Sequence, residues 1–245
     1  MDTNQLIEHF MCFGLTRQEA TLYLCLAQYG EMTGYEAAKQ TGISRSNAYN
    51  ALAGLADKGA AYTQEGAAVR YRAVDAGEFC QNKIRDLKER KRQIELHMPK
   101  QKTEAEGYLT ITGDKHIADK IKNMFAASKQ RVYLSMTAEF VRMFEPEIRA
   151  AAEAGKKIVI LTDAPVEYTG VIVYQTEDKA RQIGVIADSK NVLTGEFGKG
   201  ETSACLYSGQ LNFVQVFKDS MRNEIRLIQL LKGEAQHEKR TICNL

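Results

Sequence analysis

A run of hydrogen-bonding side chains between residues 44 and 50 carries the clearest chemical signal in this sequence. Asn and Arg side chains can form paired hydrogen bonds with base edges in the DNA major groove, and Ser and Tyr hydroxyls can reach phosphate oxygens. Such a mixture within one helical turn or two is suited to contacting double-stranded DNA. The residues expected to make these contacts are Ser44, Arg45, Ser46, Asn47, Tyr49 and Asn50.

The elements around this run predict a helix-turn-helix. Residues 33–40 read as a short helix, and Gly42 suits the turn that follows because glycine readily adopts positive φ. Ser44 is a typical N-cap for a second helix over residues 45–58, which Gly59 would end. The second helix has an apolar stripe at helical spacing. This stripe consists of Ala48, Leu52 and Leu55.

Two short alternating segments after the second helix predict a hairpin wing. They cover residues 60–64 and 69–74. Arg70 and Arg72 lie two apart on the second segment, so their side chains point to the same side of a strand. There they could contact the phosphate backbone or the minor groove. Residues 1–74 are therefore expected to form a winged helix-turn-helix domain.

Four motifs in the first third of the chain share the spacing of a known family. They are Leu15-Thr16-x-x-Glu19-Ala20-x-x-Tyr23-Leu24, Ser44-Arg45-Ser46-x-x-Tyr49-x-x-Leu52, Lys58-Gly59 and Arg70-Tyr71-Arg72-Ala73-Val74. Through these motifs the chain resembles the TrmB family of winged-helix transcriptional regulators. The resemblance implies a dimeric, sequence-specific DNA-binding protein whose C-terminal domain binds an effector.

Residues 76–98 predict one long helix that ends at Pro99, because proline cannot continue a helix. Its apolar residues alternate by fours and threes, as the seam of a coiled coil does. We expect this helix to pair with a second copy of the chain, and residues 75–106 to form the dimerisation helix and a polar linker. The expected dimer contacts are Ile84, Leu87, Ile94 and Met98.

From residue 107 onward the pattern changes to alternating strands and helices, which predicts an α/β domain with a mixed sheet over residues 107–245. We expect a helix capped by Asp114, a single helix over residues 138–154, a strand over residues 202–208 and a long terminal helix over residues 209–232. The overall fold class is therefore α+β: a winged helix, a helical linker and a mixed-sheet domain.

Residues 183–195 resemble the signature hairpin of phospholipase D-like domains, whose active form is HxKxxxxD. With Asp188 at the Asp position of this motif, Arg181 replaces the nucleophilic His and Ile183 replaces the phosphate-binding Lys. Arginine does not deprotonate and isoleucine carries no charge, so neither can supply the missing chemistry. The resemblance implies a catalytically inactive domain that is reused for pairing or ligand sensing.

The composition of the chain limits the classes of protein to which it can belong. The chain has 245 residues, enough for a small and a larger domain, and 44% of them are hydrophobic. No apolar run suggests a membrane span or a signal peptide, so we expect a cytoplasmic protein. The five cysteines lack a CxxC pair, and the sequence indicates neither a metal site nor a cofactor. The net charge of +2 means that DNA affinity must come from local arrangement.

These observations favour a homodimeric transcriptional regulator that is not an enzyme and whose partners are double-stranded DNA, a second copy of itself and a small-molecule effector. No residue that binds the effector can be identified from the sequence. Two alternatives stay open: a phospholipase D-like phosphodiesterase or nuclease with a DNA-binding head, and a non-specific, chromatin-type DNA-binding protein.

Overall fold

The computed structural model describes residues 2–66, 68–99, 107–177 and 179–242, with residues 232–242 described by their backbone alone. The chain forms two compact units, residues 1–100 and residues 101–245, and each is described by itself. The division between them falls at the predicted linker. Within the described ranges, no helix is both long enough and apolar enough to cross a membrane.

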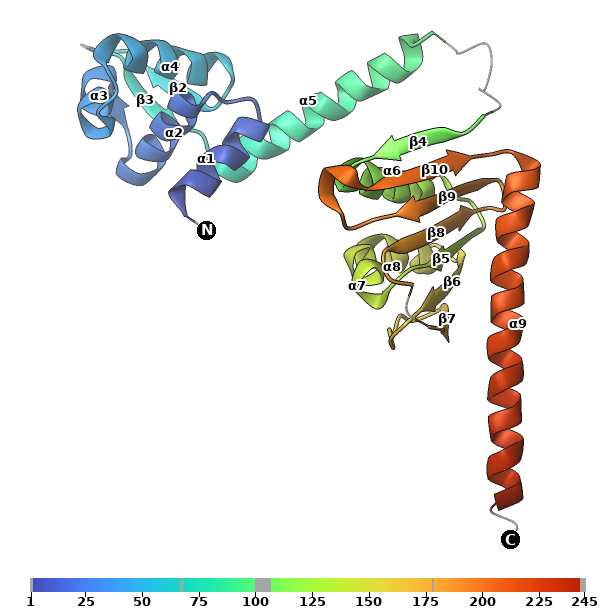
Figure 1. Ribbon diagram of the computed structural model, residues 1–245. Coiled ribbons are helices and arrows are strands. Elements are labelled where there is room, and N and C mark those ends of the chain that lie inside the picture. Colours follow the sequence, from blue (N-terminus) through green and yellow to red (C-terminus); the bar gives the residue numbers. More distant parts are fainter. Residues whose placement is uncertain (1, 67, 100–106, 178, 243–245) are drawn as a thin grey trace. The chain divides into compact units, whose positions relative to one another are not determined.

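The first unit is a winged helix-turn-helix followed by a long helix (Figure 1). Its three short strands form one antiparallel sheet in the order β1-β3-β2. The elements are α1 (Thr3–Cys12), α2 (Arg17–Tyr29), β1 (Met32–Thr33), α3 (Gly34–Thr41), α4 (Arg45–Asp57), β2 (Ala61–Gln64), β3 (Arg70–Ala73) and α5 (Ala76–His97). The predicted helix-turn-helix and hairpin wing are thus confirmed.

Local capping explains where the helices of this unit begin. Thr16 and Glu19 form a capping box at the start of α2, and Thr33 forms an equivalent box at the start of α3. Because Thr33 is the cap, α3 begins one residue later than predicted. Between α3 and α4, Gly42 has φ of 72°, the left-handed conformation that glycine adopts without steric cost. Ser44 then caps α4 by accepting a hydrogen bond from the Asn47 amide.

The core of the first unit extends to the base of α5. Phe79 is 1% exposed, and its ring lies 6.4 Å from the ring of Phe10 and 6.1 Å from that of Tyr23, measured between centroids. The Tyr23 hydroxyl donates a 2.6 Å hydrogen bond to the Val74 carbonyl, just before α5 begins. Phe79 is the one buried residue among those described in α5. The helix is therefore anchored to the first unit by its first turn.

The second unit is built on a seven-stranded mixed sheet with the strand order β4-β10-β9-β8-β5-β6-β7. Strands β5, β6 and β7 run parallel to one another, and the other neighbouring pairs are antiparallel. The strands are β4 (Leu109–Thr112), β5 (Arg131–Ser135), β6 (Lys157–Thr162), β7 (Val171–Gln175), β8 (Gln182–Ala187), β9 (Asn191–Glu196) and β10 (Ala204–Ser208). This arrangement confirms the predicted α/β domain with a mixed sheet.

Helices cover the two faces of this sheet unequally. Alternate residues of a strand point to opposite faces, so Val132 and Leu134 pack into the main core while Tyr133 lies on the other face. The main core is formed with α6 (Asp114–Ala127), α7 (Ala138–Met143) and α8 (Glu145–Glu153). The opposite face packs against a single helix, α9 (Leu211–Ile242), through Val214 and Met221 (Figure 1).

Several predicted boundaries in the second unit were wrong. The single helix expected over residues 138–154 is divided at Phe144, because Pro146 is accommodated in the first turn of a new helix, α8. The strand expected from residue 202 begins at Ala204, after the short 3₁₀ helix Gly200–Thr202. The terminal helix continues beyond residue 232 to Ile242. Asp114 does not cap α6, whose N-cap is Gly113.

Candidate nucleic-acid interface

One face of α4 is open to solvent and carries the side chains that were expected to read DNA. Ser46, Asn47 and Asn50 are exposed, whereas Ala48 and Leu52 on the opposite face are fully buried. The helix contains no acidic residue between Arg45 and Ala56. The exposed face is therefore small, polar and free of the negative charge that would repel phosphate.

Arg45, at the first position of α4, is held by an aromatic ring of the preceding helix. Its guanidinium lies 4.4 Å from the centroid of the Tyr35 ring, and Tyr35 itself is 48% exposed. This cation–π contact limits the orientations of Arg45 while leaving it beside the exposed face. Sequence reasoning missed Tyr35. An exposed aromatic residue ten positions before an arginine was the available signal, but only the turn geometry brings the two together.

Tyr49 packs against the backbone of α3. A side chain at Gly34 would collide with the Tyr49 ring, so the absence of a Cβ there lets the ring approach closely. Tyr49 is nevertheless 46% exposed, which leaves its outer edge accessible. The ring therefore helps fix the angle between α3 and α4. Because the same packing holds the Tyr49 side chain in place, its predicted contact with phosphate would not require the side chain to be ordered first.

The two wing arginines have different surroundings. Arg70 forms ion pairs with Glu31 at 2.7 Å and with Glu36 at 3.7 Å, and it also donates a hydrogen bond to the Glu31 carbonyl. Its charge is thus compensated within the protein, and it ties β3 to the segment before α3. Arg72 is exposed and forms no ion pair with any residue that the structure describes. Of this pair, Arg72 is the better placed for contact with phosphate.

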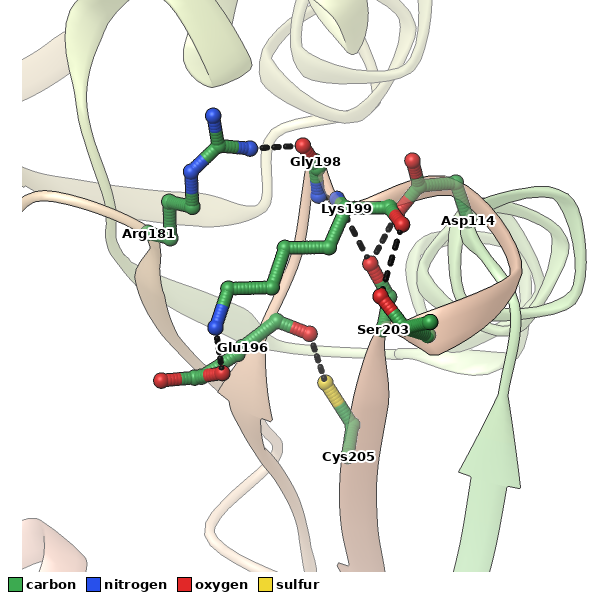
Figure 2. A network of polar contacts seen from close by, with 8 residues as sticks. Asp114, Arg181, Glu196, Gly198, Lys199, Ser203 and Cys205 are labelled. Atoms are coloured by element: carbon green, nitrogen blue, oxygen red, sulfur yellow. Dashed lines mark hydrogen bonds and ion pairs between the residues drawn. The ribbon is translucent and has the colours of Figure 1, made fainter.

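The second unit does not assemble the phospholipase D-like catalytic groups. Ile183 is 3% exposed and belongs to the main core, and Arg181 donates a hydrogen bond to the Gly198 carbonyl (Figure 2). Ile183 thus contributes to core packing, and Arg181 forms a hydrogen bond within the protein. Among the described residues, no group of three or more His, Cys, Asp and Glu side chains is placed to hold a metal ion.

Asp114 organises the loop between β9 and β10 beside this position. Its carboxylate accepts hydrogen bonds from the Gly198 amide at 2.8 Å, the Gly200 amide at 2.7 Å and the Ser203 hydroxyl at 2.5 Å. Figure 2 shows Asp114 close to Ser203, and Gly198 between Asp114 and the Arg181 guanidinium. Burial raises the pKa of Asp114, but the hydrogen bonds outweigh burial and hold it below its usual value. The loop is therefore fixed by a structural network.

Asp188, the one motif residue that is retained, also has a structural role. Its carboxylate accepts hydrogen bonds from the backbone amides of Lys129, Gln130 and Arg131 at 2.7, 2.8 and 2.9 Å. Asp188 and Ser189 have φ of 51° and 56°, and together they form the tight turn between β8 and β9. Burial raises the pKa of Asp188, but the three amides outweigh burial and lower it below its usual value.

Replacing Asp188 with Asn is expected to lower the free energy of unfolding of the second unit by roughly 1.5–3 kcal/mol at pH 7, the usual range for hydrogen bonds to a charged group. The folded-state pKa is depressed, so this stabilisation is present above about pH 4, the unfolded value, and is lost as the pH falls through the folded value. The variant should therefore differ less from the wild type at pH 3 than at pH 7. Urea unfolding at several pH values measures this, with Asp119→Asn, an exposed site, as the control.

Comparison with known proteins finds a family model that matches the first unit and relatives whose similarity extends into the second unit. Residues 10–77 match the family model described as "Sugar-specific transcriptional regulator TrmB". The uncharacterized protein YrhO of Bacillus subtilis (strain 168) is 26% identical over 228 residues, which cover 89% of this chain and 83% of that protein. The putative HTH-type transcriptional regulator TrmBL2 of Pyrococcus furiosus is 28% identical over 166 residues, or 61% of this chain and 63% of that protein.

The chain is also similar to solved structures, with TM-scores below 0.5 for the two described here. The structure of TrmBL2, described as an archaeal chromatin protein with a novel mode of DNA binding, has a TM-score of 0.41 and 21% identity, and covers 91% of this chain and 97% of that chain. Nuc, a phospholipase D family member from Salmonella typhimurium, has a TM-score of 0.37 and 11% identity. This alignment covers 49% of this chain and 95% of that one.

Proposed function

Since this chain belongs to the TrmB family of transcriptional regulators, we propose that it acts in the cytoplasm as a homodimer that recognises one DNA sequence and responds to a small-molecule effector. The single observation that carries sequence recognition is the exposed face of α4, where Ser46 and Asn50 are accessible while Leu52 is buried. A helix that presents such side chains can enter the major groove and form hydrogen bonds with base edges.

The charge of the chain supports specific rather than general binding. The net charge is only +2, and Arg70 is neutralised by Glu31 and Glu36. Non-specific affinity for DNA comes almost entirely from cationic contacts with phosphates. A protein with few free cations at its DNA-binding domain must therefore obtain much of its affinity from base contacts, which only the matching sequence provides.

Homodimerisation is supported by the exposed apolar residues of α5. Leu87, Ile94 and Met98 are 59, 63 and 67% exposed, and Ile84 is 37% exposed. Ile84, Leu87 and Ile94 follow the spacing of a coiled-coil seam along a 22-residue helix that is about 33 Å long at the helical rise, and Met98 is the C-cap residue just after this helix. A second copy of α5 would bury this stripe and bring two DNA-binding domains together on a two-fold symmetric site.

The double variant Leu87→Glu and Ile94→Glu is expected to convert dimers into monomers at micromolar concentration, because it places like charges opposite each other in the seam. Sedimentation velocity measures the change. Arg85→Gln with Arg92→Gln is the matched control, since it changes the net charge by the same two units on the same helix outside the seam. If the seam variant stays dimeric, the proposed role of α5 in pairing is wrong.

We also propose that the second unit is not an enzyme. Phosphodiester transfer requires a nucleophilic imidazole and a cation to hold the phosphate, and the corresponding positions carry Arg181 and the buried Ile183. We expect no turnover of bis(p-nitrophenyl) phosphate above the buffer rate. Turnover by the wild type that is lost on replacing Arg181 with Ala would instead favour the phosphodiesterase alternative.

Selection of bound fragments from random DNA tests the proposed function. We expect enrichment of a two-fold symmetric sequence with half-sites separated by about 10 base pairs or a multiple of that distance, as two linked recognition helices require. An unenriched pool that binds as tightly as the selected one would favour the chromatin-type alternative.

A further inference from the structure

A cationic cavity lies between α9 and the sheet face opposite the main core. Its volume is about 430 Å³, and its walls come from β5, β6, β7, β8, the turn after β8, and one side of α9. No Asp or Glu is among the described residues that line it. The five cations of the lining are Arg131, Lys157, Lys218, Arg222 and Arg226.

The fold places these cations close together at an energetic cost. Arg131 and Lys157 are direct partners in the parallel register of β5 and β6. Like charges at directly opposite positions of neighbouring strands are destabilising. On α9, Lys218, Arg222 and Arg226 follow one another at intervals of four residues, which also places like charges beside each other. The cavity therefore concentrates positive charge from three elements, β5, β6 and α9, that are far apart in the sequence.

Little of this charge is compensated within the chain. Arg222 forms an ion pair with Asp219 at 2.5 Å. The other four cations form no ion pair with any carboxylate in the part of the chain that the structure describes. A bound anion would remove the mutual repulsion, so the cavity is electrostatically suited to a ligand that carries more than one negative charge.

Apart from Ser189 and Gln229, the remaining lining is apolar and aromatic. Val159, Ile186 and Met221 are buried side chains that form part of the lining, and Tyr133 and Tyr174 contribute rings and hydroxyls. A bound phosphate ion without an organic group would leave these apolar side chains without a contact to the ligand. A ligand with an organic body can cover the apolar residues while its anionic group meets the cations, and a volume of about 430 Å³ lies within the usual range for small-molecule sites.

We propose that this cavity binds a small organic phosphate, and, resting on the proposed regulatory function, that this compound is the effector. A phosphate monoester carries about −1.5 to −2 charges at neutral pH, and arginine guanidinium groups bind phosphate oxygens in pairs. The ligand would lie between α9 and the sheet and contact both. Its binding would favour one position of α9 relative to β5 and β6.

Isothermal titration of the full-length protein with inorganic pyrophosphate, at constant ionic strength and without DNA, tests the cationic part of the site, which is the part that any organic phosphate must use. We expect saturable binding that weakens at least tenfold in the double variant Lys218→Gln and Arg226→Gln. Both side chains line the cavity, and neither forms an ion pair with a carboxylate in the part of the chain that the structure describes. The matched control is Lys115→Gln with Lys129→Gln, which removes the same charge outside the cavity. Absence of saturable binding, or equal loss in the control, would overturn the proposal.

Two further measurements separate the alternatives. A random 20-base-pair duplex is titrated into the same variants, and a loss of duplex affinity without any pyrophosphate binding would assign this face to nucleic acid and overturn the small-ligand site. Binding of the DNA sequence selected from the random pool is measured independently. If that binding is retained while pyrophosphate fails to bind, the proposed cavity site is wrong, whereas the proposed function of the first unit is unaffected.

Discussion

Replacing Asn50 with alanine is expected to weaken binding to the selected DNA sequence by about 1–3 kcal/mol, or roughly 5- to 150-fold, the usual contribution of a bidentate base contact. Asn50 is exposed on α4, on the face opposite the buried Leu52, so the substitution removes no core contact. Affinity for unrelated sequences should stay unchanged, because an amide that pairs with a base edge contributes little to phosphate binding. Fluorescence anisotropy with both kinds of duplex measures the difference.

Replacing Arg72 with alanine is expected to affect DNA binding differently from replacing Asn50. The exposed guanidinium of Arg72 is expected to contact phosphate, so its loss should weaken binding to all sequences alike and lower the slope of log affinity against log salt by about one. Arg70→Ala should affect folding more than the salt slope, because Arg70 is paired with Glu31 and Glu36. Equal losses on random DNA for the Asn50 and Arg72 variants would contradict this division of roles.

Phe79→Ala is expected to lower the free energy of unfolding of the first unit by about 3–5 kcal/mol, the range for truncating a buried phenylalanine. Phe79 is 1% exposed and contacts the rings of Phe10 and Tyr23. Because it is the one buried residue described in α5, its loss should also free the base of that helix. Urea unfolding followed by circular dichroism measures the stability, and amide exchange in α5 measures the anchoring.

Leu96→Ala is the control for this prediction. Leu96 lies on the same helix outside the proposed seam and is 64% exposed, so its truncation should leave the unfolding free energy of the first unit nearly unchanged. A Phe79 variant as stable as the Leu96 variant would mean that α5 is held by contacts other than this aromatic cluster.

Sequence reasoning succeeded where structure depends on neighbours along the chain. The caps at Thr16 and Ser44 involve residues three positions apart, and the stripe of α4 repeats at helical spacing, so both could be predicted from the sequence. The same reasoning failed for Asp114. Its partners Gly198 and Gly200 are more than eighty positions away, and without them the carboxylate looked like a helix cap.

The candidate sites, too, could be predicted only where they depend on neighbours along the chain. The exposed face of α4 follows from helical periodicity, but the ion pairs of Arg70 depend on how β3 meets the segment before α3, which the sequence does not specify. The cationic side of α9 could have been noticed from the spacing of Lys218, Arg222 and Arg226. That Arg131 and Lys157 face it depends on the parallel register of β5 and β6.

Recognition of DNA bases by the exposed face of α4 is tested most directly by the ratio of dissociation constants of the wild type for a shuffled duplex and for the selected duplex at 150 mM salt. We expect a ratio of about 10³ or more, as is usual for specific binding, and a fall of about tenfold or more when Ser46 and Asn50 are both replaced with alanine. A wild-type ratio near one, or a ratio unaffected by the two substitutions, would contradict it.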